Sequence, residues 1–166
     1  IPWQHSSLCR VGSVTKFFAG TVLVLRDESG DLDLDEPAKT YLPKTVVKRI
    51  ENLDRCTIRQ LLNHNSGIHN YLASTSLVLE ALGSYRYEYQ PKRKLLEYSY
   101  DQPAEYAPGE GWNYSNTNFL LLEMIAEKAT GTDSQTLLDS LIIEPLGLRS
   151  TFYHPGAALP PNLARG

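Results

Sequence analysis

The sequence predicts one mainly helical globular domain, and three observations support this fold class. The chain has 166 residues, of which 42% are apolar and 21% charged, a balance typical of a folded domain with a core. Several apolar runs end at Gly or Pro, as helices do. The alternation that marks half-buried strands is weak throughout, so short strands are expected only at about 7–11 and 150–153.

The first expected element is a helix over about residues 13–27. It is apolar on nearly every face, which predicts burial on most sides rather than at a surface. The next stretch is expected to be irregular, because Pro37 and Pro43 oppose helix formation. A short helix over about residues 57–63 should follow, ended by an Asn-Ser-Gly turn.

The second half of the chain begins with a tyrosine-rich segment over residues 69–105. Helices are expected there over about 77–82 and 92–98, and the segment is interpreted as a wall or lid. Its tyrosines either line a cleft or are half-exposed packing residues. Residues 107–116 have the Pro and Gly content of a loop.

Two helices are expected after this loop. The first covers about residues 117–130 and is closed by Gly131 at its C-terminus. The second is capped by either Asp133 or Ser134 and ends near Pro145.

Charge and composition exclude several classes of function. The formal charge is -3, the sequence pI is about 5.8, and the basic residues are scattered, so no nucleic-acid surface is expected. The chain has no transmembrane segment and no signal-peptide layout. Cys9 and Cys56 are expected to be two buried thiols. A small-molecule or peptide substrate is the favoured partner, and the oligomeric state is left open.

Ser13 and Lys16 form an S-x-x-K motif at the start of the first expected helix. Residues three apart lie on one helix face, so the two side chains can meet within hydrogen-bond distance. A serine becomes a good nucleophile when a base takes its proton, and a lysine serves as that base where burial favours the neutral amine. Phe17 and Phe18 are expected to provide this burial. Otherwise, Ser13 simply caps a core helix.

Tyr114 and Asn116 form a second motif, Y-x-N, in the Gly-rich loop. A phenol beside a lysine ammonium ionises more easily and can pass a proton to a leaving group, while a carboxamide can contact a substrate amide. Each motif is expected about 0.5 times by chance at this composition, so neither is decisive alone. Their order and their flanking residues decide the interpretation.

Five stretches, in order, carry a resemblance to known proteins: RVGSVTKFFAG, LDLDEPAKTYLP, TIRQLLNHNSGI, PGEGWNYSNTNFLLLEMIAEKATG and IIEPLGLRSTFY. Together they resemble the serine beta-lactamase and penicillin-binding-protein family. This family includes class C beta-lactamases, D-alanyl-D-alanine carboxypeptidases, related esterases and D-amino-acid peptidases. The resemblance implies an α+β fold of the serine beta-lactamase/DD-peptidase type, of which the visible chain is mainly the helical part and most of the antiparallel sheet is missing.

The resemblance also implies roles for the two motifs. Ser13 resembles the nucleophile that becomes acylated and Lys16 its proton acceptor, while Tyr114 resembles the proton shuttle. Asn116 resembles a substrate-binding residue that contacts the substrate amide near Lys16, and the Ser13 backbone N–H resembles half of an oxyanion hole. The stretch around His64 resembles a structural loop. No cofactor or metal is implied, and the family alone suggests a periplasmic or secreted protein.

The family's third motif, Lys-Thr-Gly or His-x-Gly, lies on a strand that supplies the other oxyanion donor. This motif is expected to be absent here, together with the N-terminal strands. Residues 1–166 are therefore interpreted as a partial serine hydrolase domain that is inactive by itself.

Three competing interpretations were compared with the serine hydrolase. A zinc protease would need two histidines four residues apart on a Glu-bearing helix, and His64 and His69 do not fit this spacing. A Ser-His-Asp hydrolase would need G-x-S-x-G, which does not occur. The serious alternative is a non-catalytic member that binds peptide or cell-wall fragments. The absent third motif favours it, and the four intact site residues oppose it.

Overall fold

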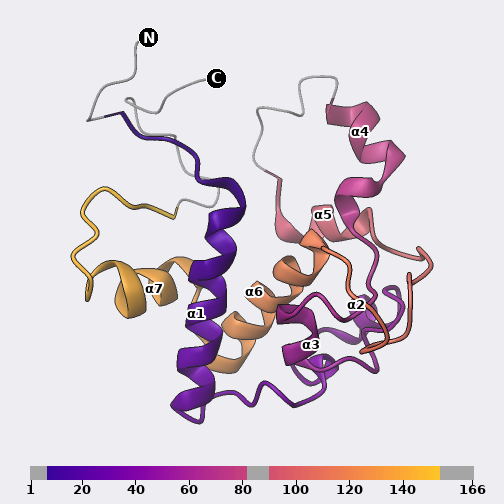
Figure 1. Cartoon of the computed structure of the whole chain (residues 1–166), viewed down its shortest axis with the longest axis horizontal. Helices are drawn as coiled ribbons and strands as arrows, with labels where there is room; N and C mark the ends of the chain where they lie inside the picture. Colours follow the sequence, from indigo (N-terminus) through magenta and orange to yellow (C-terminus); the bar gives the residue numbers. More distant parts are fainter. Residues whose placement is uncertain (1–6, 82–89, 154–166) are drawn as a thin grey trace.

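The computed structural model describes residues 7–81 and 90–153, and these residues are mostly helical (Figure 1). In chain order the elements are the 3₁₀ turn η1 (Gly12–Val14), α1 (Thr15–Glu28), the 3₁₀ turn η2 (Ala38–Tyr41), α2 (Lys44–Val47), α3 (Ile58–Leu62), the 3₁₀ turn η3 (Tyr71–Ala73), α4 (Thr75–Ala81), α5 (Lys92–Glu97), α6 (Asn116–Thr130), α7 (Ser134–Leu138) and the π-helical turn η5 (Asp139–Ile143).

The strands expected at 7–11 and 150–153 are not formed. Over the described ranges, β pairing is limited to isolated bridges such as the one between Pro37 and Thr57. A strand needs a neighbour along its whole length, and neither segment has one among these residues. The described structure therefore shows the helical part of an α+β fold and leaves the expected sheet a prediction.

Helix α6 is the centre of the core. Leu121, Leu122 and Ile125 are fully buried, and α6 contacts α1, α3, α5 and α7. It lies between α1 on one side and α3 on the other (Figure 1). Gly131 ends the helix with a φ of 68°, a left-handed conformation that costs glycine little. This confirms the predicted C-terminus, and the helix begins at Asn116, after Ser115 at the N-cap position.

Helix α1 is covered on one face only. Val22 and Leu23 are its buried residues, and they lie on the face that contacts α6 and α7. Phe17 is 79% exposed and Val24 is 43% exposed. The expectation of burial on most sides is therefore wrong for the described structure, because no described element covers the face that carries Phe17.

The segment before α3 is more ordered than the sequence indicated. The 3₁₀ turn η2 fits between the two prolines, and α2 follows directly after Pro43. Helix α3 agrees with its prediction, since Thr57 and Gln60 form a reciprocal capping box at its start. The 3₁₀ turn and α2 were missed because each is too short to show a hydrophobic period.

The remaining predicted helices are present with small shifts. Helices α4 and α5 match the two expected in the tyrosine-rich segment, whose residues 82–89 lie outside the described part. Asp133, and not Ser134, caps α7: its carboxylate accepts the Thr136 N–H at 3.0 Å. The π-helical turn η5 then ends the helical stretch before Pro145.

The two cysteines differ. Cys56 is fully buried, and burial raises the pKa of its thiol to about 12. Cys9 is exposed, so the prediction of two buried thiols is wrong for this residue. It lies in a non-helical segment ahead of η1 and not on an element that faces the core. No helix in the described residues is long and apolar enough to cross a membrane.

Candidate active site

Ser13 lies in the 3₁₀ turn that leads into α1. Gly12 begins the turn with a φ of 53°, and the Val14 N–H donates to the Val11 carbonyl at 3.1 Å. This geometry places Ser13 and Lys16 on the same side of the chain. The Lys16 ammonium lies 3.4 Å from Ser13 Oγ, as the spacing of the motif predicts.

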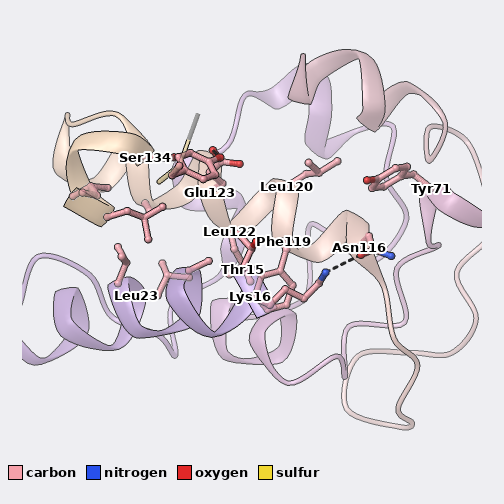
Figure 2. Close-up of a pocket in the computed structure, with 16 residues that line it drawn as sticks. Thr15, Lys16, Leu23, Tyr71, Asn116, Phe119, Leu120, Leu122, Glu123 and Ser134 are labelled. Carbon is pink, nitrogen blue, oxygen red and sulfur yellow. Dashed lines mark hydrogen bonds between the residues drawn. The ribbon is translucent and has the colours of Figure 1, made fainter. Parts of the chain in front are cut away.

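Tyr114 and Asn116 approach the same two residues from the other end of the sequence. The Tyr114 hydroxyl donates to Ser13 Oγ at 2.8 Å. Lys16 Nζ donates to Asn116 Oδ1 at 2.8 Å, and this bond is drawn in Figure 2. The structure thus brings together the four side chains selected from the two motifs, although about 100 residues separate the motifs in sequence.

Aromatic rings surround the Lys16 ammonium. Its nitrogen lies 5.0 Å from the centroid of the Tyr114 ring and 5.3 Å from that of Phe119, distances at which a cation is attracted to the ring face. Phe17 does not contribute, because its side chain points into solvent. Phe18 is partly buried against the core, and the rings nearest to Lys16 come from the second motif and from α6.

Neighbouring groups change the pKa of the Tyr114 phenol. Desolvation by burial raises its pKa, but hydrogen bonding with Lys16 and Ser13 and the charge of Lys16 act in the opposite direction and outweigh it. The net pKa of Tyr114 lies below the ordinary value of 10. Its phenolate is therefore more accessible near neutral pH than that of a free tyrosine, which suits a proton-transfer role.

A loop after α3 holds the segment that carries Tyr114. We call residues 63–70 the scaffold loop and residues 105–116 the tyrosine loop. Asn65 donates from Nδ2 to the Gly111 carbonyl and accepts the Gly109 N–H on its own carbonyl, both at 2.8 Å. The Glu105 N–H donates to the Gly67 carbonyl at 2.9 Å. The two loops are joined along their length.

Asn52 and Gly67 bring the two loops close together. The buried Asn52 amide donates to the Ser66 carbonyl at 2.8 Å and to the Tyr106 carbonyl at 2.7 Å. Gly67 has a φ of 69°, and a Cβ at this position would clash with the Tyr106 carbonyl oxygen. Only glycine fits this contact without moving the tyrosine loop.

Asn70 is a site residue that the sequence analysis missed. Its Oδ1 accepts the Asn116 backbone N–H at 3.1 Å and the Asn116 Nδ2 at 3.2 Å. Because the amide nitrogen of Asn116 faces Asn70, its oxygen faces Lys16. A lone Asn between a Gly-containing turn and a tyrosine gives no pattern from which this role could be read.

Two hollows border the site. A cavity of about 170 Å³ lies between α1, α6 and α7, with Lys16 and Asn116 at one end and the apolar Leu23 and Leu122 farther along (Figure 2). An open groove of about 860 Å³ follows the exposed face of α1, and Ser13 and Tyr114 are among the residues that line it. Among the described residues no cluster of three His, Cys, Asp or Glu could hold a metal ion.

The third motif requires a correction. Residues 154–156 read His-Pro-Gly, so the expectation that no His-x-Gly triplet occurs is wrong as a statement about the sequence. These residues lie outside the described part of the chain. The described residues therefore include Ser13, Lys16, Tyr114 and Asn116 but not this triplet.

Comparison with known proteins assigns the family. A family model described as Beta-lactamase matches residues 1–166. The chain belongs to the beta-lactamase family. It is 28% identical over 152 residues to penicillin-binding protein 4* of Bacillus subtilis, covering 90% of this chain and 31% of that protein. It is 30% identical over 159 residues to esterase EstB of Burkholderia gladioli, covering 89% of this chain and 39% of that protein.

Solved structures show the same fold. A D-stereospecific amidohydrolase from Streptomyces is 38% identical with a TM-score of 0.78, over 84% of this chain and 42% of that one. The D-amino acid amidase from Ochrobactrum anthropi, complexed with D-phenylalanine, is 30% identical with a TM-score of 0.82, over 100% of this chain and 44% of that one. The chain therefore spans between about a third and less than half of the proteins it matches, and their names support a hydrolase of the beta-lactamase, DD-peptidase and esterase type.

Proposed function

We propose that this chain carries the nucleophile of a serine hydrolase that works through an acyl-enzyme at Ser13. The supporting observation is the convergence of Ser13, Lys16 and Tyr114, with the Tyr114 oxygen 2.8 Å and the Lys16 nitrogen 3.4 Å from Ser13 Oγ. A serine with two proton-transfer groups at this range has the arrangement of an activated nucleophile.

In the proposed reaction, Ser13 Oγ attacks the acyl carbon of the substrate and its proton passes to the Lys16–Tyr114 pair. Tyr114 lies closer to Oγ, so its phenolate is the nearer acceptor, and the Lys16 ammonium stabilises that phenolate. The same proton then goes to the leaving group, which departs as an amine or alcohol. Water repeats the sequence on the Ser13 ester, releasing the acid and restoring the hydroxyl.

We assign two roles to the Asn116 side chain in this proposal. Its oxygen holds Lys16 at 2.8 Å, and its amide group lies where it can meet the amide of a bound substrate. The Ser13 backbone N–H is proposed as one oxyanion donor. The second donor is proposed to come from outside the described residues, and its loss would cost about 10²- to 10³-fold in rate.

The proposed substrate class is a β-lactam, a D-alanyl peptide or an ester, extended to D-amino-acid amides by the names of the similar proteins. The cavity beside Lys16 and Asn116 is mostly apolar, which suits a small apolar acyl group. A panel of nitrocefin, a D-Ala-D-Ala peptide, D-phenylalanine amide and a p-nitrophenyl ester would rank these substrates for the full-length protein.

The alternative is a non-catalytic module that binds peptide or cell-wall fragments in the same cleft. Incubating the full-length protein with a fluorophosphonate, followed by peptide mass analysis, separates the two functions. Added mass on the Ser13 peptide, absent from Ser13→Ala, supports the hydrolase. An intact protein that binds cell-wall peptides without added mass supports the binding module.

A further inference from the structure

His64 has an unusual backbone conformation beside the site. Its φ is 60°, in the left-handed region that few residues other than glycine adopt. The surrounding hydrogen bonds explain why it is held there. The His64 carbonyl accepts the Asn113 N–H at 3.1 Å and the Tyr106 hydroxyl at 3.0 Å. A strained residue tied to a functional loop is a candidate for a role in that loop.

The His64 carbonyl binds the residue before Tyr114, and the His64 ring binds the residue after it. Its Nδ1 accepts the Ser115 backbone N–H at 3.1 Å. Its centroid lies 4.5 Å from that of the Tyr114 ring, with the two planes inclined by 36°. His64 therefore binds the backbone of both residues that flank Tyr114 and also packs against its ring.

We propose that His64 is a positioning residue for Tyr114, and that the productive placement of the Tyr114 hydroxyl on Ser13 requires the neutral imidazole. This inference rests on the proposed function of Tyr114. An imidazole accepts on Nδ1 only when that nitrogen carries no proton, whereas an imidazolium donates from both nitrogens. In the protonated ring, the His64 Nδ1–H would face the Ser115 backbone N–H. The hydrogen bond between them would be lost, and the tyrosine loop would be released.

The charged and titratable groups that face His64 favour the neutral form. The Lys16 ammonium faces His64 from α1, and the Tyr106 and Tyr114 phenols face it from the tyrosine loop. Helix α6 contributes the uncharged Phe119 ring, whose centroid lies 5.4 Å from that of the His64 ring. Burial, and then the charge of Lys16, lower the pKa of His64 below 6.5. Because only the neutral imidazole accepts the Ser115 N–H, the arrangement is present above the pKa of His64 and is lost as the pH falls through that pKa.

The variant His64→Asn distinguishes a positioning role that depends on the titration of the ring from a purely structural role. Asparagine tolerates the left-handed conformation, and its Oδ1 can take the place of Nδ1 as acceptor, but it does not titrate. We expect about a tenfold loss of kcat/KM at pH 8, because the ring contact with Tyr114 is removed, and a profile that no longer falls as the pH drops through the lowered pKa of His64. His69→Asn is the matched control, since the hydrogen bonds of His69 in the structure are made by its carbonyl.

The test measures kcat/KM against pH for the full-length parent, His64→Asn and His69→Asn. An acidic limb in the parent and in His69→Asn that is missing from His64→Asn supports the inference; a limb unchanged in His64→Asn overturns it. NMR titration of the substrate-free parent adds a readout independent of turnover. The Ser115 amide should shift with the same midpoint as the His64 imidazole, and a Ser115 amide that ignores this titration also overturns the inference. Failure of Ser13 to acylate at any pH would instead contradict the proposed hydrolase.

Discussion

The two sides of the Ser13 helix are built differently. On one side the scaffold loop and the tyrosine loop are joined through the backbone and side chains of Asn52, Asn65 and Gly67, and they present Tyr114 to Ser13. On the other side, that of Phe17 and Val24, α1 is exposed at an open groove that His64 and Tyr114 border from the loop side. The described residues thus hold Tyr114 beside Ser13 and leave the Phe17 face of α1 uncovered.

This difference separates the contacts that position Tyr114 beside Ser13 from an apolar helix face that no described element covers. The distance from Ser13 to Tyr114 depends on two loops within this chain, both held by buried polar contacts. The exposed apolar face of α1 has no such partners among the described residues. The comparison predicts that changes on the loop side damage the chemistry, whereas changes on the groove side affect association more than chemistry.

Tyr114→Phe should have the largest effect. It keeps the ring against His64 and Lys16 but deletes the hydroxyl that lies 2.8 Å from Ser13 Oγ. Turnover should fall about 10²- to 10⁴-fold, with little change in substrate binding. Tyr106→Phe is the matched control, because it removes one hydrogen bond to the His64 carbonyl and should cost less than tenfold. Turnover of Tyr114→Phe within twofold of the parent would assign Tyr114 to packing.

Gly67→Ala should be the next most severe change. Alanine adds a Cβ against the Tyr106 carbonyl at a φ of 69°, so the tyrosine loop must move. Gly30→Ala is the control: its φ is 79°, but nothing lies within 4 Å of the added carbon. Left-handed strain alone costs about 1–2 kcal/mol, and Gly67→Ala should exceed this in thermal or urea unfolding and also slow acylation. Equal losses for the two variants would show that the loops are not in close contact.

Asn70→Ala should give a moderate loss on the same side. Without Oδ1 of Asn70, the Asn116 amide loses the contact that turns its oxygen toward Lys16. We expect about a tenfold fall in kcat/KM, in line with the loss of one polar contact of roughly 1.4 kcal/mol. Asn70→Asp retains the acceptor and should keep more activity than Asn70→Ala. The reverse order in a kinetic comparison would remove this orienting role.

Phe17→Ser should have the smallest effect on stability. The side chain is 79% exposed, so the free energy of unfolding of residues 1–166 should change by less than about 0.5 kcal/mol. Self-association of this chain should decrease, because a large exposed apolar group favours contact between copies. Urea unfolding measures the stability of the parent and of Phe17→Ser, and light scattering against concentration compares their self-association. A large loss of stability would mean that the groove side is covered after all.

Much of the fold could be predicted because its signals are local. The helix that ends at Gly131 and the capping box at Thr57 follow from residue types at fixed offsets. The exposure of Phe17 could not be predicted, because a helix packed on both faces and a helix packed on one face can have the same apolar sequence. The short α2 and the π-helical turn arise from tertiary packing and leave no periodic signal.

The candidate site shows the same limit. The two motifs selected Ser13 and Tyr114, since the chemistry requires those residue types at that spacing. Asn70 and His64 are proposed to act through the backbone N–H groups of Asn116 and Ser115, contacts that join residues 46 and 51 positions apart. A single sequence contains no pattern that links such segments, so these residues became visible only in three dimensions.

Covalent modification of Ser13 by a reagent for activated serines is the most direct test of the central claim. The full-length protein would be treated with a fluorophosphonate, digested, and analysed by mass for the peptide that contains residue 13, in the parent, Ser13→Ala and Lys16→Ala. The account predicts stoichiometric added mass on Ser13 in the parent, none at this peptide in Ser13→Ala, and slow addition in Lys16→Ala. A folded parent that remains unmodified, or a Lys16→Ala protein phosphonylated at the parental rate, would contradict it.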